Sequence, residues 1–299
     1  MSKALCIYGE VLFDCFPDGR EVLGGAPFNV AWHLQAFGQS PMFISRIGDD
    51  EPGRQIRRSM MDWGMKLEGL QTDPKHPTGR VAITLDNGEP SYDIVADSAY
   101  DFIDARTLAA VEPGWIYHGT LGLRNPDSFA ALQQLKSRSA AHVFVDVNLR
   151  PPWWQRAAVL TLVDNAAWVK LNRDELALLG DGQPDELAAA ERFLVRHGLD
   201  GLVLTLGADG AIAVTANAEP IRISPNGVSE VVDAVGAGDA FASVLILGLR
   251  LGWPLAETMK RAQDFASELV RRQGATVADP ALYRSLRDAW GIPSAGIGA

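Results

Sequence analysis

Apolar runs and helix-like apolar stripes alternate along most of the chain. Between two of the runs, Leu187, Ala190 and Leu194 share one face of an expected helix that starts near Asp185 and ends before Gly198. The runs themselves are nearly continuous, which is typical of strands buried on both faces of a parallel sheet. They cover residues 42–48, 115–119, 143–149, 167–172 and 202–207. The alternation predicts an α/β fold with a doubly wound, mostly parallel sheet flanked by helices.

Two further helices are predicted from the same periodicity. Ile56, Met60 and Trp63 follow a spacing of four and then three residues, and Gly64 is placed to end that helix. One apolar stripe also runs over residues 254–274, which begin with a proline suited to a first helical turn and end with a glycine.

Residues 10–23 and 78–100 break the alternation. Both contain β-prone residues and turn signals, and neither contains a helical pattern of its own. The second includes Asn87-Gly88 between two β runs, a strong hairpin signal. We expect the two stretches to form a small sheet, a lid over one edge of a single α/β domain that spans residues 1–299. Residues 292–299 are expected to be a frayed tail.

Charge and composition narrow the class of protein. The net charge of -10 and the lack of a basic stripe argue against nucleic acid as a partner, although backbone amides could still hold a small phosphate. Cys6 and Cys15 lack metal-site spacing and are expected to be reduced thiols. The N-terminal apolar run is interrupted by Glu10 and Asp14, and the longest apolar run, residues 240–249, is too short to cross a bilayer. We therefore expect a cytoplasmic protein without a membrane partner.

The stretch VVDAVGAGDAF (231–241) places glycines and carboxylates between an apolar β-like run and an apolar helical run. Gly236, Ala237 and Gly238 can expose successive backbone N–H groups, and the positive end of the next helix dipole adds to them. Such an anion hole suits a transferring phosphoryl group. Asp239 would lie in the first helical turn, with its pKa kept low, and could accept a proton from a substrate hydroxyl.

A plainer interpretation of residues 231–241 is a tight turn followed by a helix N-terminal acid. The stretch is not a Walker A loop, because no Lys-Ser/Thr follows the glycines, and it does not match the G-x-G-x-x-G dinucleotide fingerprint.

Other polar stretches fall near the ends of predicted strands. Gly24 and Gly25 can bring backbone close to a ligand, and Asn29 either caps the helix that ends at Gly38 or binds sugar hydroxyls. Asp14, at a predicted strand end, is either solvated or a hydroxyl acceptor.

Three more stretches follow predicted strands farther along the chain. Residues 146–150, DVNLR, stack polar side chains at a strand end. Asn172 and Glu175 could face one way from a helix start and hold hydrated Mg²⁺ and phosphate oxygens. Residues 205–211 predict a strand, a turn and a strand that could supply amides to a nucleotide. Each has a plainer account as a cap or surface ion pair, but ligands of α/β sheets bind beyond strand carboxyl ends, so their joint placement predicts one cleft.

Over essentially the whole chain, these residues resemble the PfkB family of carbohydrate kinases, also called ribokinase-like. One signature is GGAPFN (24–29), with Gly38 and Gly48 at the family's spacing. The second is DAVGAGD (233–239), and Asn172 with Glu175 matches the family's N-x-x-E motif.

The resemblance implies ATP-dependent phosphorylation of a sugar hydroxymethyl group. It makes Asp239 the catalytic base, the amides of Gly236, Ala237 and Gly238 the anion hole, and the two β stretches lid strands that also form a homodimer surface. The remaining roles are sugar binding by Asp14, Gly24, Gly25, Asn29 and Arg150, nucleotide binding by Asn172, Thr205, Gly207, Gly210 and Gly238, Mg²⁺ binding through water by Glu175, and binding of a monovalent cation such as K⁺ near Asp233 and Val235.

Two positions depart from the family pattern. Ala234 stands where the family usually has Thr, Ser or Pro, and Val244 stands where it usually has Ala or Gly. Both flank the anion hole without supplying its amides, so they concern nucleotide packing rather than the chemistry.

Among relatives, the GGAP, GEVLFD and DVNLRPPWW segments are most similar to fructokinases. Trp153 and Trp154 either line the sugar site or pack under the next helix. The alternatives are a ribokinase-type kinase and a 2-keto-3-deoxygluconate kinase, whose acid substrate would need a cationic clamp from Arg80, Arg124 or Arg150. From other classes, a catalytically silent sugar or nucleotide sensor stays open, whereas GEVLFD after the first strand disfavours a dinucleotide oxidoreductase.

Overall fold

The computed structural model describes residues 3–86, 89–225 and 232–293. Within them the main sheet has the strand order β13-β12-β11-β10-β9-β8-β1-β4-β5. Neighbours from β5 to β11 pair in parallel, whereas β12 and β13 are antiparallel additions at one edge. The strands are β1 (Ala4–Tyr8), β4 (Met42–Gly48), β5 (Leu70–Asp73), β8 (Pro113–His118), β9 (His142–Asp146), β10 (Trp168–Asn172), β11 (Gly201–Thr205), β12 (Ala211–Thr215) and β13 (Ala218–Ile223).

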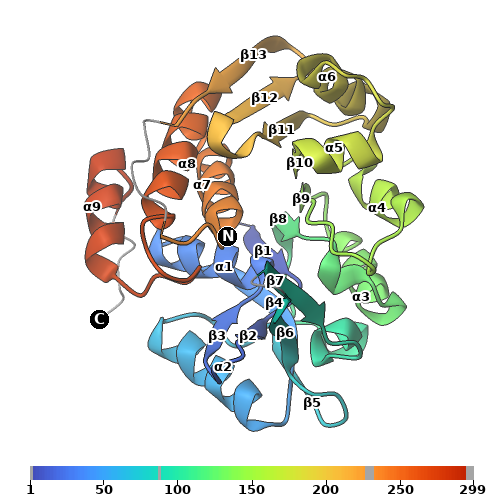
Figure 1. The fold of residues 1–299 in the computed structure, drawn as a ribbon, viewed down its shortest axis with the longest axis vertical. Helices are drawn as coiled ribbons and strands as arrows, with labels where there is room; N and C mark the ends of the chain where they lie inside the picture. Colours follow the sequence, from blue (N-terminus) through green and yellow to red (C-terminus); the bar gives the residue numbers. More distant parts are fainter. Residues whose placement is uncertain (1–2, 87–88, 226–231, 294–299) are drawn as a thin grey trace.

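Helices cover both faces of the main sheet (Figure 1). One apolar cluster joins α1 (Ala26–Ala36), α2 (Glu51–Asp62), α7 (Ala237–Leu251), α8 (Leu255–Leu269) and α9 (Pro280–Trp290). Clusters on the other face join α3 (Pro126–Lys136), α4 (Arg156–Val163), α5 (Arg173–Leu179) and α6 (Glu186–His197). Short 3₁₀ turns are η1 (Ala99–Phe102), η2 (Ala105–Thr107), η3 (Leu121–Leu123) and η4 (Gly207–Asp209). The predicted doubly wound α/β fold is confirmed.

A second sheet has the order β3-β2-β6-β7 and is called the small sheet below. Its strands are β2 (Leu12–Cys15), β3 (Glu21–Gly24), β6 (Gly79–Asp86) and β7 (Glu89–Ile94). They come from the two stretches that were predicted to form a separate sheet, although the Asn87-Gly88 turn itself lies outside the described residues. Its apolar side chains pack with Tyr100 and Leu121, which follow β7 and β8, so the small sheet rests on the loops at one edge of the main sheet.

The predicted element bounds are close to those observed, with two differences. Asp185 caps α6 and Gly198 ends it in the left-handed conformation, as the pattern indicated. In contrast, α8 begins after Pro254 and ends at Leu269, short of Gly274, because the chain turns there to meet residues 232–233. Those residues are not in a strand, and the amides of Val232 and Asp233 both donate to Val270 O (2.8 and 3.1 Å). The prediction of a β run that ends at Asp233 is therefore wrong for residues 232–233. Residue 231 and most of the predicted frayed tail, from residue 294 on, lie outside the described residues.

No helix in the described parts of the chain combines the length and the apolar character that a membrane span requires.

Candidate active site

The glycine loop before α7 is fixed from both sides. Gly236 has φ 81°, and a Cβ there would lie 2.4 Å from Ala275 Cβ, so a larger residue is excluded. Asp233 accepts hydrogen bonds from Val235 N (2.9 Å) and from Gly274 N (3.1 Å). The loop leads into the first turn of α7, where Gly238 is exposed at the positive end of the helix dipole, a place suited to an anion. The Ala237 amide donates to Ala234 O at 3.3 Å, a long bond that an anion would have to replace.

Asp239 lies in the first turn of α7 and is bonded to a side chain from a distant part of the sequence. Asn29 Nδ2 donates to Asp239 Oδ2 at 2.7 Å. Burial raises the pKa of the Asp239 carboxyl to about 7, and the Asn29 bond opposes that rise. The prediction that a helix N-terminus would keep this pKa low is therefore wrong, because desolvation outweighs the helix dipole. A carboxyl with a pKa near neutrality is well suited to accept a proton.

Asn29 is not a helix cap. The N-cap of α1 is Gly25, and Asn29 lies one turn inside the helix, 4% exposed. Its Oδ1 is buried and has no hydrogen-bond partner among the described residues. An orphaned acceptor beside Asp239 is a place for a substrate hydroxyl to donate, which favours the binding interpretation over the cap.

The double glycine brings the start of α1 against the β1–β2 loop. Gly25 has φ 109°, and a Cβ there would lie 2.7 Å from Glu10 O. A Cβ on Gly24 would lie 3.4 Å from Asp14 Oδ2. Asp14 is the last residue but one of β2, where it pairs with Val22 and Val81, so it lies near a strand end as predicted.

The Asp14 carboxyl lies within electrostatic reach of other residues of the predicted site. Burial raises the pKa of this half-buried carboxyl to about 6, Arg150 opposes the rise and Asp233 adds to it. Arg150, which is exposed, likewise lowers the pKa values of Glu10 and Asp239. One arginine thus lies close enough to act electrostatically on carboxyls of the β1–β2 loop, the small sheet and α7.

The other two arginines of the predicted acid clamp are already neutralised. Arg80 Nη1 bonds Glu21 Oε1 at 2.8 Å, and Arg124 makes a two-pronged ion pair with Asp101, with both N–O distances 2.7 Å. Only Arg150 of the three makes no ion pair within the described residues.

Sequence reasoning missed two residues of the site. Glu10, 3% exposed, accepts from Gly122 N at 3.2 Å, and burial raises its pKa to about 7. Lys170 Nζ bonds Asp146 Oδ1 at 2.7 Å beneath the glycine loop, where a Cβ on Gly238 would lie 3.5 Å from it. A lysine inside the otherwise apolar strand AWVKLN was the available signal, because a buried ammonium needs a carboxylate partner.

Two of the predicted nucleotide-binding residues lie at the ends of β10 and β11. Asn172 and Thr205 are paired neighbours across these strands, so their side chains lie near each other. Asn172 and Glu175 form a reciprocal capping box on α5, and Glu175 Oε1 also accepts from Leu149 N at 3.0 Å. The cap interpretation is correct for this pair, and burial raises the pKa of the Glu175 carboxyl.

In the Gly207–Gly210 turn there is free space beside Gly207 but none beside Gly210. Gly207 has φ 60°, and a Cβ added there would have nothing within 4 Å, whereas a Cβ on Gly210 would lie 2.0 Å from Ile223 O. The close approach of β13 thus accounts for Gly210 without a ligand, and the open Gly207 leaves room for one.

The remaining residues considered above have simple surroundings. Trp154 packs on the cluster of α4, as one of its two interpretations predicts, whereas Trp153 packs under the small sheet. Val244 is fully buried on α7, and Ala234 is exposed beside the glycine loop. Cys6 and Cys15 are free thiols. No group of three or more His, Cys, Asp or Glu in the described parts could bind a metal unaided.

Comparisons with known proteins agree with this geometry. Residues 9–282 match the profile described as pfkB family carbohydrate kinase. The chain is 30% identical to a fructokinase of Klebsiella pneumoniae, over 94% of this chain and 97% of that protein. It is 29% identical to an aminoimidazole riboside kinase of Salmonella typhimurium, over 94% and 92% respectively. A double-mutant fructokinase of Vibrio cholerae O395, solved with fructose, ADP and potassium, superposes with a TM-score of 0.82 at 26% identity, covering 95% of this chain and 98% of that one.

Proposed function

Because the chain belongs to the pfkB family of carbohydrate kinases, we propose that this sugar phosphotransferase moves the γ-phosphate of ATP to a hydroxymethyl group of fructose. The observation that carries the proposal is the Asn29–Asp239 bond in the first turn of α7, which holds a carboxyl with a pKa of about 7 beside the N-terminal amides of that helix. A proton acceptor and an anion site are the two elements that in-line phosphoryl transfer needs.

In this mechanism the sugar lies between the small sheet, α1 and α7. Asp14, the Gly24-Gly25 backbone and Arg150 bind its hydroxyls, and Asn29 Oδ1 accepts one more. Asp239 takes the proton of the hydroxymethyl oxygen as that oxygen bonds to the γ-phosphorus, and the bond from phosphorus to the bridging oxygen of ADP breaks. The amides of Gly236, Ala237 and Gly238 stabilise the charge on the phosphoryl oxygens.

The nucleotide would extend from the glycine loop toward Asn172, Thr205, Gly207 and Gly210. The Glu175 carboxylate accepts one backbone hydrogen bond on each oxygen, from Leu149 N and Asn172 N, and each oxygen can accept more, which fits a Mg²⁺ ion held through water. Magnesium would supply charge neutralisation on the phosphates. Backbone carbonyls near Asp233 and Val235 would take a monovalent cation, as supported by the potassium-bound fructokinase relative.

The fructokinase relatives support fructose as the first candidate. A 2-keto-3-deoxy acid needs an available cation for its carboxylate; Glu21 and Asp101 occupy two of the three candidate arginines, so such a substrate would depend on Arg150. Because one relative is an aminoimidazole riboside kinase, ribosides are the second candidate class of substrate.

The test is ATP turnover, measured as ADP release and as sugar phosphate by mass spectrometry. The panel is fructose, ribose, tagatose, 2-keto-3-deoxygluconate, aminoimidazole riboside and an adenosine control. The highest kcat/KM for fructose is expected. A preference for the keto acid would overturn the substrate, and binding of sugar and ATP without turnover would indicate the silent sensor instead.

We also propose a homodimer through the small sheet. Tyr92 and Val95, at and just beyond the edge strand β7, are 57% and 38% exposed, so a partner pairing with this edge would cover apolar side chains there. Light scattering should give twice the chain mass for the native protein, and Tyr92→Glu should return the monomer; a monomeric native protein would contradict the proposal.

A further inference from the structure

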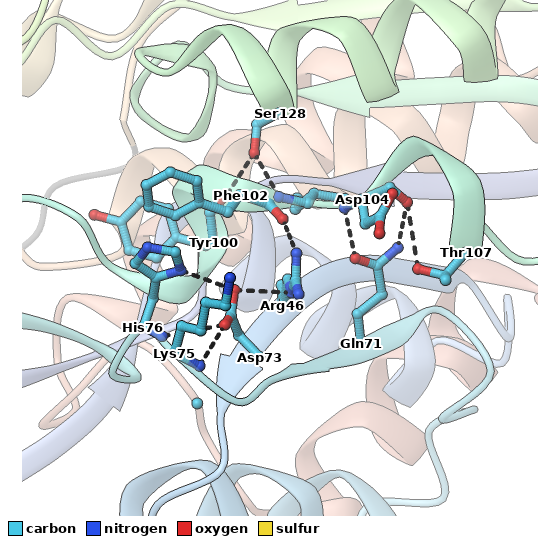
Figure 2. Close-up of polar contacts among 12 residues, drawn as sticks. Arg46, Gln71, Asp73, Lys75, His76, Tyr100, Phe102, Asp104, Thr107 and Ser128 are labelled. Carbon is cyan, nitrogen blue, oxygen red and sulfur yellow. Dashed lines mark hydrogen bonds and ion pairs between the residues drawn. The ribbon is translucent and has the colours of Figure 1, made fainter.

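The chain passes from the small sheet back to the main sheet through residues 95–107. The later part of this segment is fixed to the main sheet (Figure 2). Arg46 Nη1 donates to Phe102 O, and Ser128 Oγ donates to Tyr100 O at 2.6 Å. Gln71 exchanges two hydrogen bonds with the backbone of Asp104 (2.9 and 2.7 Å). Residues 100–104 therefore belong to the rigid frame of the main sheet.

The arginine in this frame is itself held in place. Asp73, 2% exposed, lies 3.1 Å from Arg46 Nε and 3.0 Å from His76 Nδ1, and the His76 ring stacks on Phe102 with centroids 3.7 Å apart (Figure 2). The frame is thus anchored by two strands, β4 and β5, and by the loop that leads into β6.

The earlier part of the segment belongs to the small sheet. Val95 N donates to Arg80 O at 3.1 Å and so continues the pairing of β7 with β6. Only residues 96–99 separate this end from the frame, and Asp97 there has φ 52°, a left-handed conformation that is uncommon outside glycine. The connection is short, and it borders a cavity of about 380 Å³ that is lined by Asp97, Arg124 and Trp153 among other residues.

Arg124 bridges both sides of this connection. Its guanidinium bonds both carboxylate oxygens of Asp101 in the frame at 2.7 Å, and its Nη2 also donates to Val95 O at 2.7 Å. Its side chain is 6% exposed, and its Nη1 has no hydrogen-bond partner within the described residues. A buried ion pair by itself adds little to stability, so stability alone does not account for an arginine at this position.

The same guanidinium reaches the turn that carries Arg150. Its central carbon lies 4.3 Å from the Trp153 ring centroid, and Trp153 N donates to Arg150 O at 2.7 Å. Trp153 also packs on the apolar cluster under the small sheet. One side chain therefore contacts the end of the small sheet, the frame and the indole of the Arg150 turn.

We propose that Arg124 is a positioning residue that sets the small sheet and Arg150 over the sugar. The inference rests on the proposed function, because it takes the sugar to lie between these two elements. It does not rest on a role in ATP binding, since Asn172, Thr205 and Gly207 lie on the other strands of the cleft. Loss of Arg124 should therefore act on sugar binding and leave nucleotide binding alone.

The first measurement needs no substrate. In Arg124→Met, amide hydrogen exchange of β6 and β7 should be faster by about tenfold or more, in line with the loss of charge-assisted hydrogen bonds. Because Arg124→Met leaves Asp101 buried and unpaired, the double variant Asp101→Asn/Arg124→Met is tested beside it. Arg138→Met is the matched control, a part-buried arginine just beyond α3 that donates to Ala109 O away from the small sheet. Exchange that is unchanged in both Arg124 variants, or equally fast in the control, overturns the proposal.

The second measurement compares the change in the KM for sugar with the change in the KM for ATP. In the double variant the KM for sugar should rise about tenfold or more, while the KM for ATP stays within about twofold. Arg124→Lys, which keeps the charge but not the planar fork, should recover part of the sugar KM. A parallel rise in both KM values would indicate a general structural defect and overturn the proposal. Failure of the native enzyme to phosphorylate any sugar would instead overturn the proposed function, while the exchange result would still stand on its own.

Discussion

The two ends of the proposed site are built in different ways. At the proposed sugar end, Glu10, Asp14, Asn29 and Asp239 come from strand, helix and loop segments up to 229 residues apart, and the three carboxyls all have raised pKa values. At the nucleotide end, Asn172 and Thr205 are adjacent strand termini that offer exposed groups and backbone. The proposed sugar end therefore holds its groups by long-range packing, and the proposed nucleotide end presents more exposed groups at neighbouring strand ends.

The largest expected effect comes from the one residue that belongs to the chemistry at the sugar end. Asp239→Asn should lower kcat by about a thousandfold or more, because the proton acceptor is lost while the shape is kept. Sugar binding, measured by calorimetry, should survive. Asp127→Asn, an exposed first-turn acid on α3, is the matched control and should leave kcat unchanged. A variant that retains a tenth of the native kcat would refute the base assignment.

The next effect tests whether Asn29 and Asp239 act together. Asn29→Leu removes the 2.7 Å bond to the carboxylate and the free Oδ1 acceptor, and kcat/KM for sugar should fall by about tenfold to a hundredfold. Since that bond lowers the pKa of Asp239, the acid limb of the pH profile should also move to higher pH. A fall in rate with an unmoved pH profile would show that Asn29 binds sugar only.

The pH dependence of the native enzyme follows from the same carboxyl. Burial raises the pKa of Asp239 from 3.8 to about 7, so the ionised base is lost as the pH falls through about 7. Below that value kcat/KM should drop by about tenfold per pH unit, and more steeply where Asp14 and Glu10 also protonate. Initial rates from pH 5 to 9 provide the measurement. A flat profile down to pH 5 would mean that the folded carboxyl keeps an ordinary pKa.

The smallest effect is expected at the nucleotide end. Thr205→Val should raise the KM for ATP by about threefold at most and leave kcat and the sugar KM unchanged, because one hydroxyl at a part-exposed site contributes little. A large loss of kcat would show that the nucleotide end is as preorganised as the sugar end, and would contradict the difference described between the two ends.

This contrast also separates what the sequence could predict from what it could not. The alternation of apolar runs and stripes predicted the α/β architecture, the small sheet and the placement of Asn172 and Thr205, because each depends on local pattern or on strand ends that share one edge. The glycine loop was expected after a strand, and it follows residues 232–233, which are not in one. The Asn29–Asp239 bond could not be predicted, since its partners are brought together only by the packing of α1 on α7.

Charge states were the least accessible part. A helix N-terminus lowers the pKa of a carboxyl, and from sequence that was the only local influence visible for Asp239. The opposing desolvation arises from the whole surrounding structure and is larger. Glu10 was overlooked for the same reason, because nothing in GEVLFD shows that its carboxyl is turned inward toward Gly122.

The hydrogen bond from Gly274 N to the Asp233 carboxylate also has a consequence for the synthesis of the protein. The glycine loop takes its fixed shape only when Val270 and Gly274 are present to bond residues 232 and 233. During synthesis, strands β1 to β7 leave the ribosome long before these residues do. We expect a nascent chain arrested before residue 270 to carry a formed small sheet but no working phosphate site, so that phosphoryl transfer, and any wasteful hydrolysis of ATP, begins only when translation of the domain is nearly finished.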